Sequence, residues 1–166
     1  YNYSIPLHKD NNLVSFYVLP DDHAVASVMT DIQDNISTVI GQLEAALYFS
    51  DDNYWTGQLM FVNLSSGYWV RVTDSDVLAG AGHPLELDRV YNLQSGANLV
   101  SFPSPGSVGI SAGLPDDIES SISGIISEGI AATNLNGVWS GNLSNFSGGE
   151  GYWVIATDYI SFSFEI

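Results

Sequence analysis

Gly67-Tyr68-Trp69-Val70 and Gly151-Tyr152-Trp153-Val154 are two copies of one phrase, and the rest of the chain is arranged around them. Each copy closes a longer block that opens with a second repeated phrase, Asn12-Leu13-Val14-Ser15-Phe16 in the first half and Asn98-Leu99-Val100-Ser101-Phe102 in the second. Two phrases that recur in the same order indicate an internal duplication. The chain therefore consists of two copies of one small module.

The two copies align over most of their length with a single change of register. Asn12 corresponds to Asn98, an offset of 86 residues, and Trp55 corresponds to Trp139, an offset of 84 residues. The change falls at the turn around Asp51, where chain length varies most easily. We expect a pseudo-twofold pair of modules that shares one core.

The boundary between the modules falls in a stretch rich in Gly and Asp, from Asp74 to Pro84, which we interpret as the join. We place the first module at residues 1–80 and the second at residues 81–166, packed as one compact unit. Tyr68 to Val72 is then expected to be the last strand of the first module.

Strands are favoured over helices by the abundance of Val, Ile, Tyr, Phe and Trp in short runs that the sixteen glycines interrupt. Tyr1 to Leu7 alternates apolar and polar residues, as a half-buried strand does. From Asp22, which we expect to be the N-cap, to Ile32 the apolar residues have helical spacing. We therefore predict a mainly β (β-rich α+β) fold of two tandem pseudo-symmetric β modules packed together, the first with one short helix.

The second copy departs from the first in the helical region. Residues that disfavour helices occupy it, and we expect a loop or one short turn there. These residues are Gly106, Gly109, Gly113 and Pro115.

Charge excludes several classes of partner. Three Lys and Arg residues face nineteen Asp and Glu residues, for a formal net charge of −16. Nucleic acids and anionic membrane surfaces both require cations on the protein, so neither is an expected partner.

No apolar run approaches the ~18 residues of a spanning helix, so we expect no membrane insertion. There is no cysteine, which leaves the redox compartment open.

The repeated phrases resemble a known type of module. The order Asn-Leu-Val-Ser-Phe, Ile-Ile-Ser-Glu-Gly, Trp-x-Gly-x-Leu and Gly-Tyr-Trp-Val is similar to tandem repeats in large secreted and surface proteins of marine bacteria and environmental sequences. The resemblance covers nearly the whole chain, twice. It implies a non-catalytic part of a secreted protein, and it assigns no functional residue. We expect the protein to be secreted or to lie on a cell or virion surface.

We interpret the two Gly-Tyr-Trp-Val phrases as a structural framework. Alternation along a strand sends one ring inward and the other outward, so one aromatic of each pair anchors the core and its neighbour covers a seam. We expect the glycine of each phrase to need a positive φ. The alternative is an aromatic platform for sugar rings. The framework residues are Gly67, Tyr68, Trp69, Gly151, Tyr152 and Trp153.

Better candidates for ligand binding flank two polar turns. Aromatic rings there could stack on a sugar while neighbouring amides form hydrogen bonds, which is the usual composition of a small-molecule site. A hairpin packing motif would explain the same recurrence. The candidate residues are Asn53, Tyr54, Trp55, Gln58, Asn136, Trp139 and Asn142.

Metal and catalytic signals are weak. Calcium requires six to eight oxygen ligands, and the adjacent acids supply two or three. Asp74 and Asp76 at the join form the best pair, so no cofactor is expected except a calcium ion at that point. No nucleophile elbow, phosphate loop or zinc-ligand spacing is present, and we expect no enzyme.

Three functions remain open on these observations. The first is a non-enzymatic extracellular module for adhesion or ligand binding, with a polysaccharide or other glycan as the partner. The second is a structural subunit of a surface layer, filament or virion that joins neighbouring subunits through edge strands, at Tyr1 to Leu7 or at the alternating segment Tyr159 to Ile166. The third is an accessory domain of a secreted hydrolase.

Overall fold

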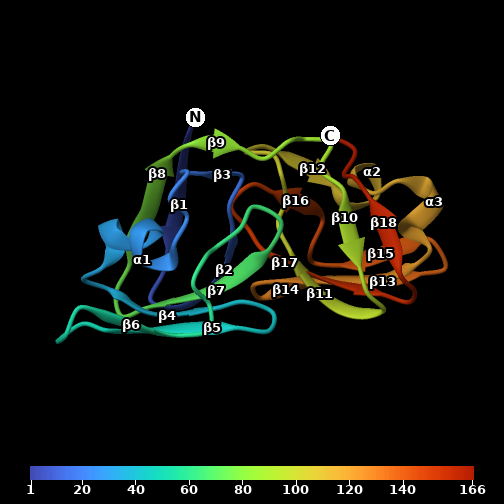
Figure 1. Cartoon of the computed structure of the whole chain (residues 1–166). Helices are drawn as coiled ribbons and strands as arrows, with labels where there is room; N and C mark the ends of the chain where they lie inside the picture. Colours follow the sequence, from blue (N-terminus) through green and yellow to red (C-terminus); the bar gives the residue numbers. More distant parts are fainter.

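The structure, a computed structural model, describes all residues from Tyr1 to Ile166. Two similar halves lie side by side, each with a five-stranded antiparallel sheet, and both sheets lie along the same side of the molecule (Figure 1). Both chain termini are on the opposite side. The prediction of a mainly β protein of two packed modules is confirmed.

The two large sheets have the same strand order. In the first module the order is β2 (Asp10–Ser15), β7 (Gly67–Val72), β4 (Ile36–Ile40), β5 (Ala45–Phe49) and β6 (Tyr54–Gly57). In the second it is β11 (Gly96–Val100), β17 (Tyr152–Ala156), β13 (Ile122–Ser127), β14 (Ile130–Leu135) and β15 (Val138–Gly141). Even the register shift recurs at equivalent places, between Ile36 and Thr38 and between Ile122 and Gly124. The duplication therefore extends to the hydrogen-bond register.

Smaller elements cover the inner faces of these sheets. The two-stranded pairs are β1 (Asn2–Leu7) with β8 (Asp76–Ala81), β3 (Val18–Leu19) with β9 (His83–Pro84), β10 (Tyr91–Leu93) with β18 (Ile160–Phe162), and β12 (Ser107–Gly109) with β16 (Asn145–Ser147). The helices are α1 (Val25–Val28) and the 3₁₀ turn Thr30–Ile32 in the first module, with α2 (Ile110–Gly113) and α3 (Asp116–Glu119) in the second.

Three local predictions need correction. The stretch Asp74 to Pro84 is not merely a join, because strand β8 within it pairs along its whole length with β1. The second copy has two single-turn helices where we expected a loop or one turn. Only Ile160–Phe162 of the predicted C-terminal strand is a strand, and it pairs with β10, so neither terminal strand is left without a partner.

Each module has its own hydrophobic core, so the expectation of one shared core is wrong. The first core contains 21 buried residues and the second contains 19. Leu64 packs against both, from a half-buried position. The halves are therefore held together by contacts other than a common core.

A buried asparagine at the start of each repeated phrase fixes the turn before it. The Asn12 side chain accepts a hydrogen bond from the His8 N–H and donates to the carbonyls of His8, Asp10 and Val70. Asn98 makes the same bonds to Gln94, Gly96 and Val154. Because every polar atom of a buried amide is satisfied, this residue stabilises the corner where the first strand of each large sheet begins.

We expected one ring of each Gly-Tyr-Trp-Val phrase to point inward, and in the structure this ring is the tyrosine. Tyr68 and Tyr152 are almost fully buried, and their hydroxyls accept hydrogen bonds from the N–H groups of Asn63 and Ser147. Desolvation raises the pKa of both hydroxyls, so they remain protonated at neutral pH. The following tryptophans are half-buried on the outer faces of the sheets.

The glycine of each phrase serves close packing between modules rather than an unusual backbone angle. Neither Gly67 nor Gly151 has a positive φ, so that prediction is wrong. A Cβ on Gly67 would lie 2.8 Å from Leu99 of the other module, and one on Gly151 would lie 2.7 Å from the Val14 carbonyl oxygen. Contact at that distance leaves no room for a side chain.

The contacts across the seam between the modules are reciprocal. Ser15 N donates to the Gly149 carbonyl at 2.9 Å, and Ser101 N donates to the Ser65 carbonyl at 3.1 Å. The edge strands β2 and β11 are thus each bonded to their own sheet and, across the seam, to the residues just before the other module's Gly-Tyr-Trp-Val strand. This explains why all five residues of each Asn-Leu-Val-Ser-Phe phrase are buried.

Candidate ligand-binding site

The predicted ligand residues Tyr54 and Trp55 lie on opposite faces of edge strand β6. Tyr54 is directly opposite Phe49 on the outer face, and both rings are at least half exposed. Trp55 lies on the inner face, where its ring packs against Tyr48 at a centroid distance of 5.0 Å. The two aromatics therefore cannot contribute to one platform.

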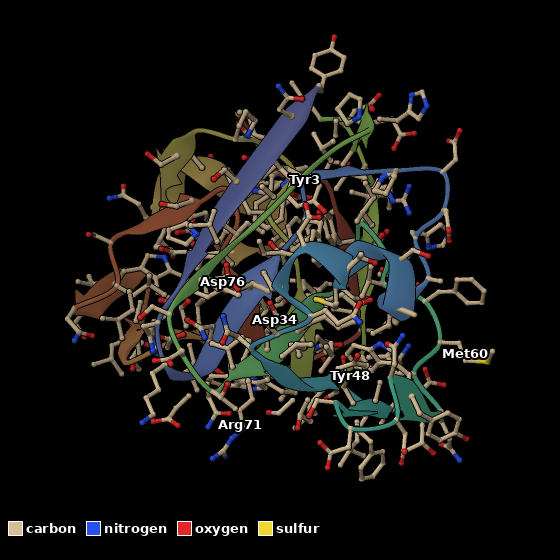
Figure 2. All side chains as sticks on the ribbon, turned by 90° about the vertical axis from the view of Figure 1, so that its left-hand side faces the viewer. Tyr3, Asp34, Tyr48, Met60, Arg71 and Asp76 are labelled. Carbon is tan, nitrogen blue, oxygen red and sulfur yellow. The ribbon has the colours of Figure 1, made fainter.

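Trp55 lines an apolar groove between β6 and α1, which we call the Trp55 groove. Its volume is about 270 Å³. The lining comes from the start of α1, from β6 and from the following loop: Ala24, Val25, Ala26, Trp55, Thr56, Gly57, Leu59, Met60 and Phe61. Met60 and Phe61 are 66% and 55% exposed, and Met60 projects from the surface in Figure 2. Exposed apolar side chains at the rim of an apolar groove are typical of a binding surface.

The indole N–H of Trp55 has no hydrogen-bond partner within the protein. Since no buried polar side-chain atom lacks a partner, this N–H is accessible to solvent. Its equivalent in the second module is different, because Trp139 Nε1 donates to Glu119 Oε1 at 2.6 Å. The residue equivalent to Glu119 is Gln33, whose amide donates to Asn53 instead. The indole N–H of Trp55 is therefore free to form a hydrogen bond, whereas that of Trp139 is already bonded within its own module.

The predicted amides mostly serve the turns. Asn53 has a φ of +48°, and its side-chain oxygen accepts hydrogen bonds from Tyr48 and Gln33. Asn136 has a φ of +54° and forms with Gly137 the two-residue turn between β14 and β15. The corresponding turn of the first module, residues 50–53, is two residues longer, which accounts for the change of offset.

The remaining two amides lie on the loops after the edge strands. Asn142 accepts a hydrogen bond from the backbone of Ala131, whereas the exposed Gln58 makes no side-chain hydrogen bond within the protein. The structure does not bring the two predicted clusters together, because β6 and β15 lie at opposite ends of the molecule (Figure 1).

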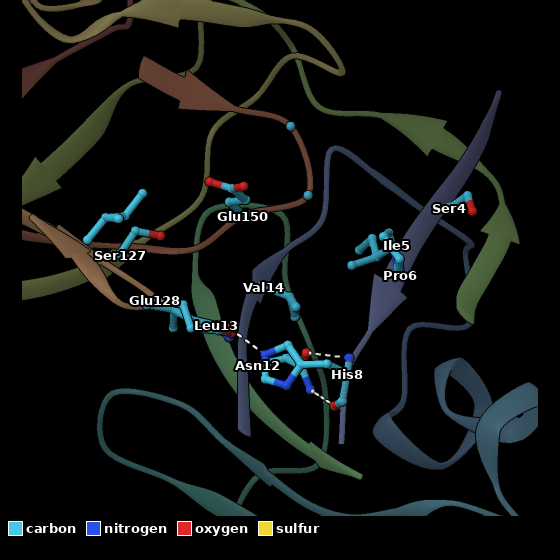
Figure 3. A pocket seen from close by; sticks show the side chains of 13 residues that line it. Ser4, Ile5, Pro6, His8, Asn12, Leu13, Val14, Ser127, Glu128 and Glu150 are labelled. Atoms are coloured by element: carbon cyan, nitrogen blue, oxygen red, sulfur yellow. Dashed lines mark hydrogen bonds and ion pairs between the residues drawn. The ribbon is translucent and has the colours of Figure 1, made fainter. Parts of the chain in front are cut away.

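The seam between the modules contains two clefts in equivalent positions. The first, which we call the charged cleft, has a volume of about 230 Å³ and includes His8, Glu128 and Glu150 (Figure 3). Glu128 accepts a hydrogen bond from Leu13 N of the other module at 2.8 Å and pairs with His8.

Both ring nitrogens of His8 face hydrogen-bond acceptors. Nδ1 lies 2.7 Å from the Lys9 carbonyl oxygen, and Nε2 contacts the Glu128 carboxylate. Only the doubly protonated ring can donate to both. The hydrogen bond to Glu128 is the main reason that the pKa of His8 is raised, followed by the bond to Lys9.

The second cleft, which we call the amide cleft, has a volume of about 410 Å³. Here Gln42 replaces Glu128, and its side chain accepts from Leu99 N at 3.1 Å and donates to the Ala97 carbonyl. Gln94 stands where His8 stands in the charged cleft, and Ser66 replaces Glu150. The geometry is kept, while His8, Glu128 and Glu150 are each replaced by an uncharged residue.

The predicted calcium pair does not gather further ligands. Asp76 uses one carboxylate oxygen to accept from Asn35 at 2.9 Å and the other to accept from its neighbour Val77 N at 2.7 Å. Asp74 is exposed. No group of three or more His, Asp or Glu side chains in the chain has the arrangement of a metal site.

Comparison with protein-family models, with curated proteins and with solved structures finds no significant match for this chain. The longest helices have four residues, and none has the length and apolar character needed to cross a bilayer.

Several residues of the groove and clefts gave no signal in the sequence. Met60 and Phe61 lie in a segment without repeat character, and the pairing of His8 with Glu128 joins residues 120 positions apart. One signal was present: the offset pairs His8 with Gln94 and Glu128 with Gln42, so the charge difference between the copies could have been read from the alignment.

Proposed function

We propose that this protein is a non-enzymatic extracellular or surface module that binds a glycan, and that the Trp55 groove is its binding surface. One observation carries the proposal: Trp55 presents an accessible N–H beside an apolar groove, whereas its twin Trp139 is bonded to Glu119. The C–H faces of a sugar ring pack against aromatic and apolar side chains, and a sugar oxygen can accept from an indole N–H.

The resemblance to repeat modules of secreted marine proteins supports an extracellular setting for this activity. The charge of −16 keeps such a surface soluble and disfavours anionic partners. Both points are compatible with adhesion to a polysaccharide.

A glycan array with three variants tests the proposal. Trp55→Ala is expected to abolish the binding that the wild type shows, because it removes both the ring and the N–H. Trp55→Phe retains most of the packing against Tyr48 and separates loss of the hydrogen bond from loss of the fold. Trp139→Ala is the matched control and should keep the glycan signal, provided that circular dichroism shows a folded protein. An array on which the wild type binds nothing, or equal loss for Trp55→Ala and Trp139→Ala, would contradict the proposal.

Assembly into a surface layer or filament is a second candidate, favoured by the outer face of the first sheet. This face exposes four large apolar side chains, and edge strand β6 beside them has no partner on its outer side. The four are Ile40, Leu47, Phe49 and Tyr54. Analytical ultracentrifugation of wild type and Leu47→Lys decides this point: concentration-dependent assembly that the lysine abolishes supports it, and a monomer at all concentrations rules it out.

A further inference from the structure

The Trp55 groove adjoins the amide cleft. Leu59 and Phe61 line both this groove and the amide cleft at the seam, so the two cavities of about 270 and 410 Å³ adjoin each other across the exposed Phe61 ring. The far wall of the amide cleft belongs to the second module, through Asn92, Gln94 and Asn98. The combined path therefore starts at an edge of the molecule and ends at its centre.

The amide cleft contains polar groups that the fold does not use. The amide nitrogens of Asn63 and Asn92 donate to nothing in the protein, although their oxygens accept hydrogen bonds from Ser65 N and from Tyr159 and Ser161. The side chains of Glu44 and Gln94 make no hydrogen bond within the protein, and both are exposed. Planar amides and a carboxylate are the groups that bind the hydroxyls of sugars, since each can accept from or donate to neighbouring hydroxyl groups.

Neither cavity contains a cation. Lys9, Arg71 and Arg89 are the only Lys and Arg residues of the chain, and none of them lines the groove or the amide cleft. The Glu44 carboxylate adds a negative charge to the lining. An anionic polysaccharide would therefore be repelled, whereas an uncharged one would not.

We propose that the Trp55 groove and the amide cleft form one continuous site for an uncharged glycan chain, which runs from Trp55 over Phe61 to Gln94. The apolar groove takes the C–H faces of the sugar rings at one end, and the amides take hydroxyls at the other. This inference rests on the proposed function and extends it from a single subsite to a chain that contacts both modules.

The second module offers no equivalent path. The residue in the place of Phe61 is Asn145, which has no aromatic ring, and the residue in the place of Glu44 is Ile130, which has no carboxylate. His8, in the place of Gln94, is bonded to Glu128. The molecule therefore has one such site despite its internal repeat.

Titration calorimetry with oligosaccharides of different length tests the inference. The probes are uncharged cello-, manno- and xylo-oligosaccharides as disaccharide and hexasaccharide, with an alginate hexasaccharide as the anionic comparison. Gln94→Ala is expected to lower the affinity for the best uncharged hexasaccharide about threefold to tenfold, because one hydrogen bond is worth on the order of 1 kcal/mol. It should leave the affinity for the disaccharide unchanged, and Phe61→Ala should weaken the hexasaccharide further. Asn145→Ala, an exposed amide in the second module, is the control and should alter neither.

The outcomes separate the two proposals. If Trp55→Ala abolishes binding while Gln94→Ala and Phe61→Ala leave hexasaccharide affinity unchanged, the continuous site is wrong and the Trp55 groove stands. Tighter binding of the alginate oligomer than of every uncharged one would also overturn the continuous site. If no uncharged oligosaccharide binds the wild type, the proposed function falls together with the inference.

Discussion

Trp55 and Trp139 occupy the same position in two copies of one fold, yet only Trp55 has an indole N–H without a partner in the protein. Both lie on the inner face of an edge strand and pack against the core of their own module. Trp139 gives its N–H to Glu119, while Trp55 lines a groove and keeps its N–H accessible. Positions that hold the fold together have stayed alike after duplication, and surface positions have diverged. The divergent positions are therefore the ones in which to look for function.

The largest effects should come from the positions that stayed alike, and they should be equal in the two modules. Asn12→Ala and Asn98→Ala each remove four equivalent hydrogen bonds from a buried site. Each is expected to lower the free energy of unfolding by about 2–3 kcal/mol, since it leaves buried backbone groups unpaired. Urea denaturation checks this. A large cost at one position and none at the other would break the equivalence of the modules.

The seam glycines should show a graded effect. Gly151→Ala places a Cβ 2.7 Å from a backbone oxygen, which cannot move aside, whereas Gly67→Ala meets the flexible Leu99 side chain first. We expect a loss of about 1–3 kcal/mol for Gly151→Ala and less for Gly67→Ala. Gly109→Ala, with no atom closer than 3.9 Å, is the control and should cost little. Thermal melts rank the three; a harmless Gly151→Ala would show that the modules are not in close contact at this point.

Removing the hydrogen-bond acceptor of Trp139 tests whether Glu119 accounts for the difference between the two tryptophans. Glu119→Ala should lower the stability by about 1 kcal/mol, because the charged hydrogen bond is only partly buried. It should also shift the indole N–H resonance of Trp139 in an NMR spectrum. Gln33→Ala, at the equivalent place, should leave the Trp55 indole resonance nearly unchanged. A Trp139 resonance that ignores Glu119→Ala would contradict the difference between the two sites.

The two clefts should differ in their response to pH. The pKa of folded His8 is raised, so its contribution to stability is fully present below the unfolded value of about 6.5 and is lost as pH rises through the folded pKa. Asp10, Lys9 and Glu128 are the charged groups near it. Because the His8 side chain is 58% exposed, the contribution should be below about 1 kcal/mol.

The variant His8→Gln copies the residue of the amide cleft and provides the measurement. Its melting temperature should fall below that of the wild type at low pH, and the gap should close at alkaline pH. Glu128→Gln, which copies Gln42, should remove the pH dependence while keeping an acceptor for Leu13 N. A gap that widens as pH rises would contradict the protonated His8 in the charged cleft.

The smallest effect is expected from removal of divalent ions. Both oxygens of Asp76 already accept hydrogen bonds, so a chelator should leave the melting temperature unchanged. A fall of several degrees on addition of EDTA, restored by calcium, would show that Asp74 and Asp76 bind an ion.

The sequence predicts the architecture because the duplication provides two observations of the same fold. Alternation predicts that one ring of each Tyr-Trp pair is buried but does not choose the tyrosine, and the two-residue change of offset places a turn where the structure has one. What cannot be read from one chain is packing between segments far apart. The positions of Gly67 and Gly151 require a glycine because Leu99 and the Val14 carbonyl approach them from the other module. No local sequence pattern shows this contact.

The site is predicted less well than the fold. Trp55 was a candidate because it flanks a polar turn, but the same argument selected Trp139, which its own module occupies. Their difference depends on Glu119 and Gln33, each 20 or more residues away along the chain. Hydrogen bonds between such positions are set by tertiary structure, so local sequence could propose both tryptophans and could not choose between them.

An NMR titration that follows the indole N–H resonances of the four tryptophans is the most direct test of this choice. With ¹⁵N-labelled protein, Trp→Phe variants for assignment and the uncharged hexasaccharide that binds best, the Trp55 resonance should move with saturating ligand while that of Trp139 stays in place. Equal movement of both resonances, or movement of Trp139 alone, would contradict the account.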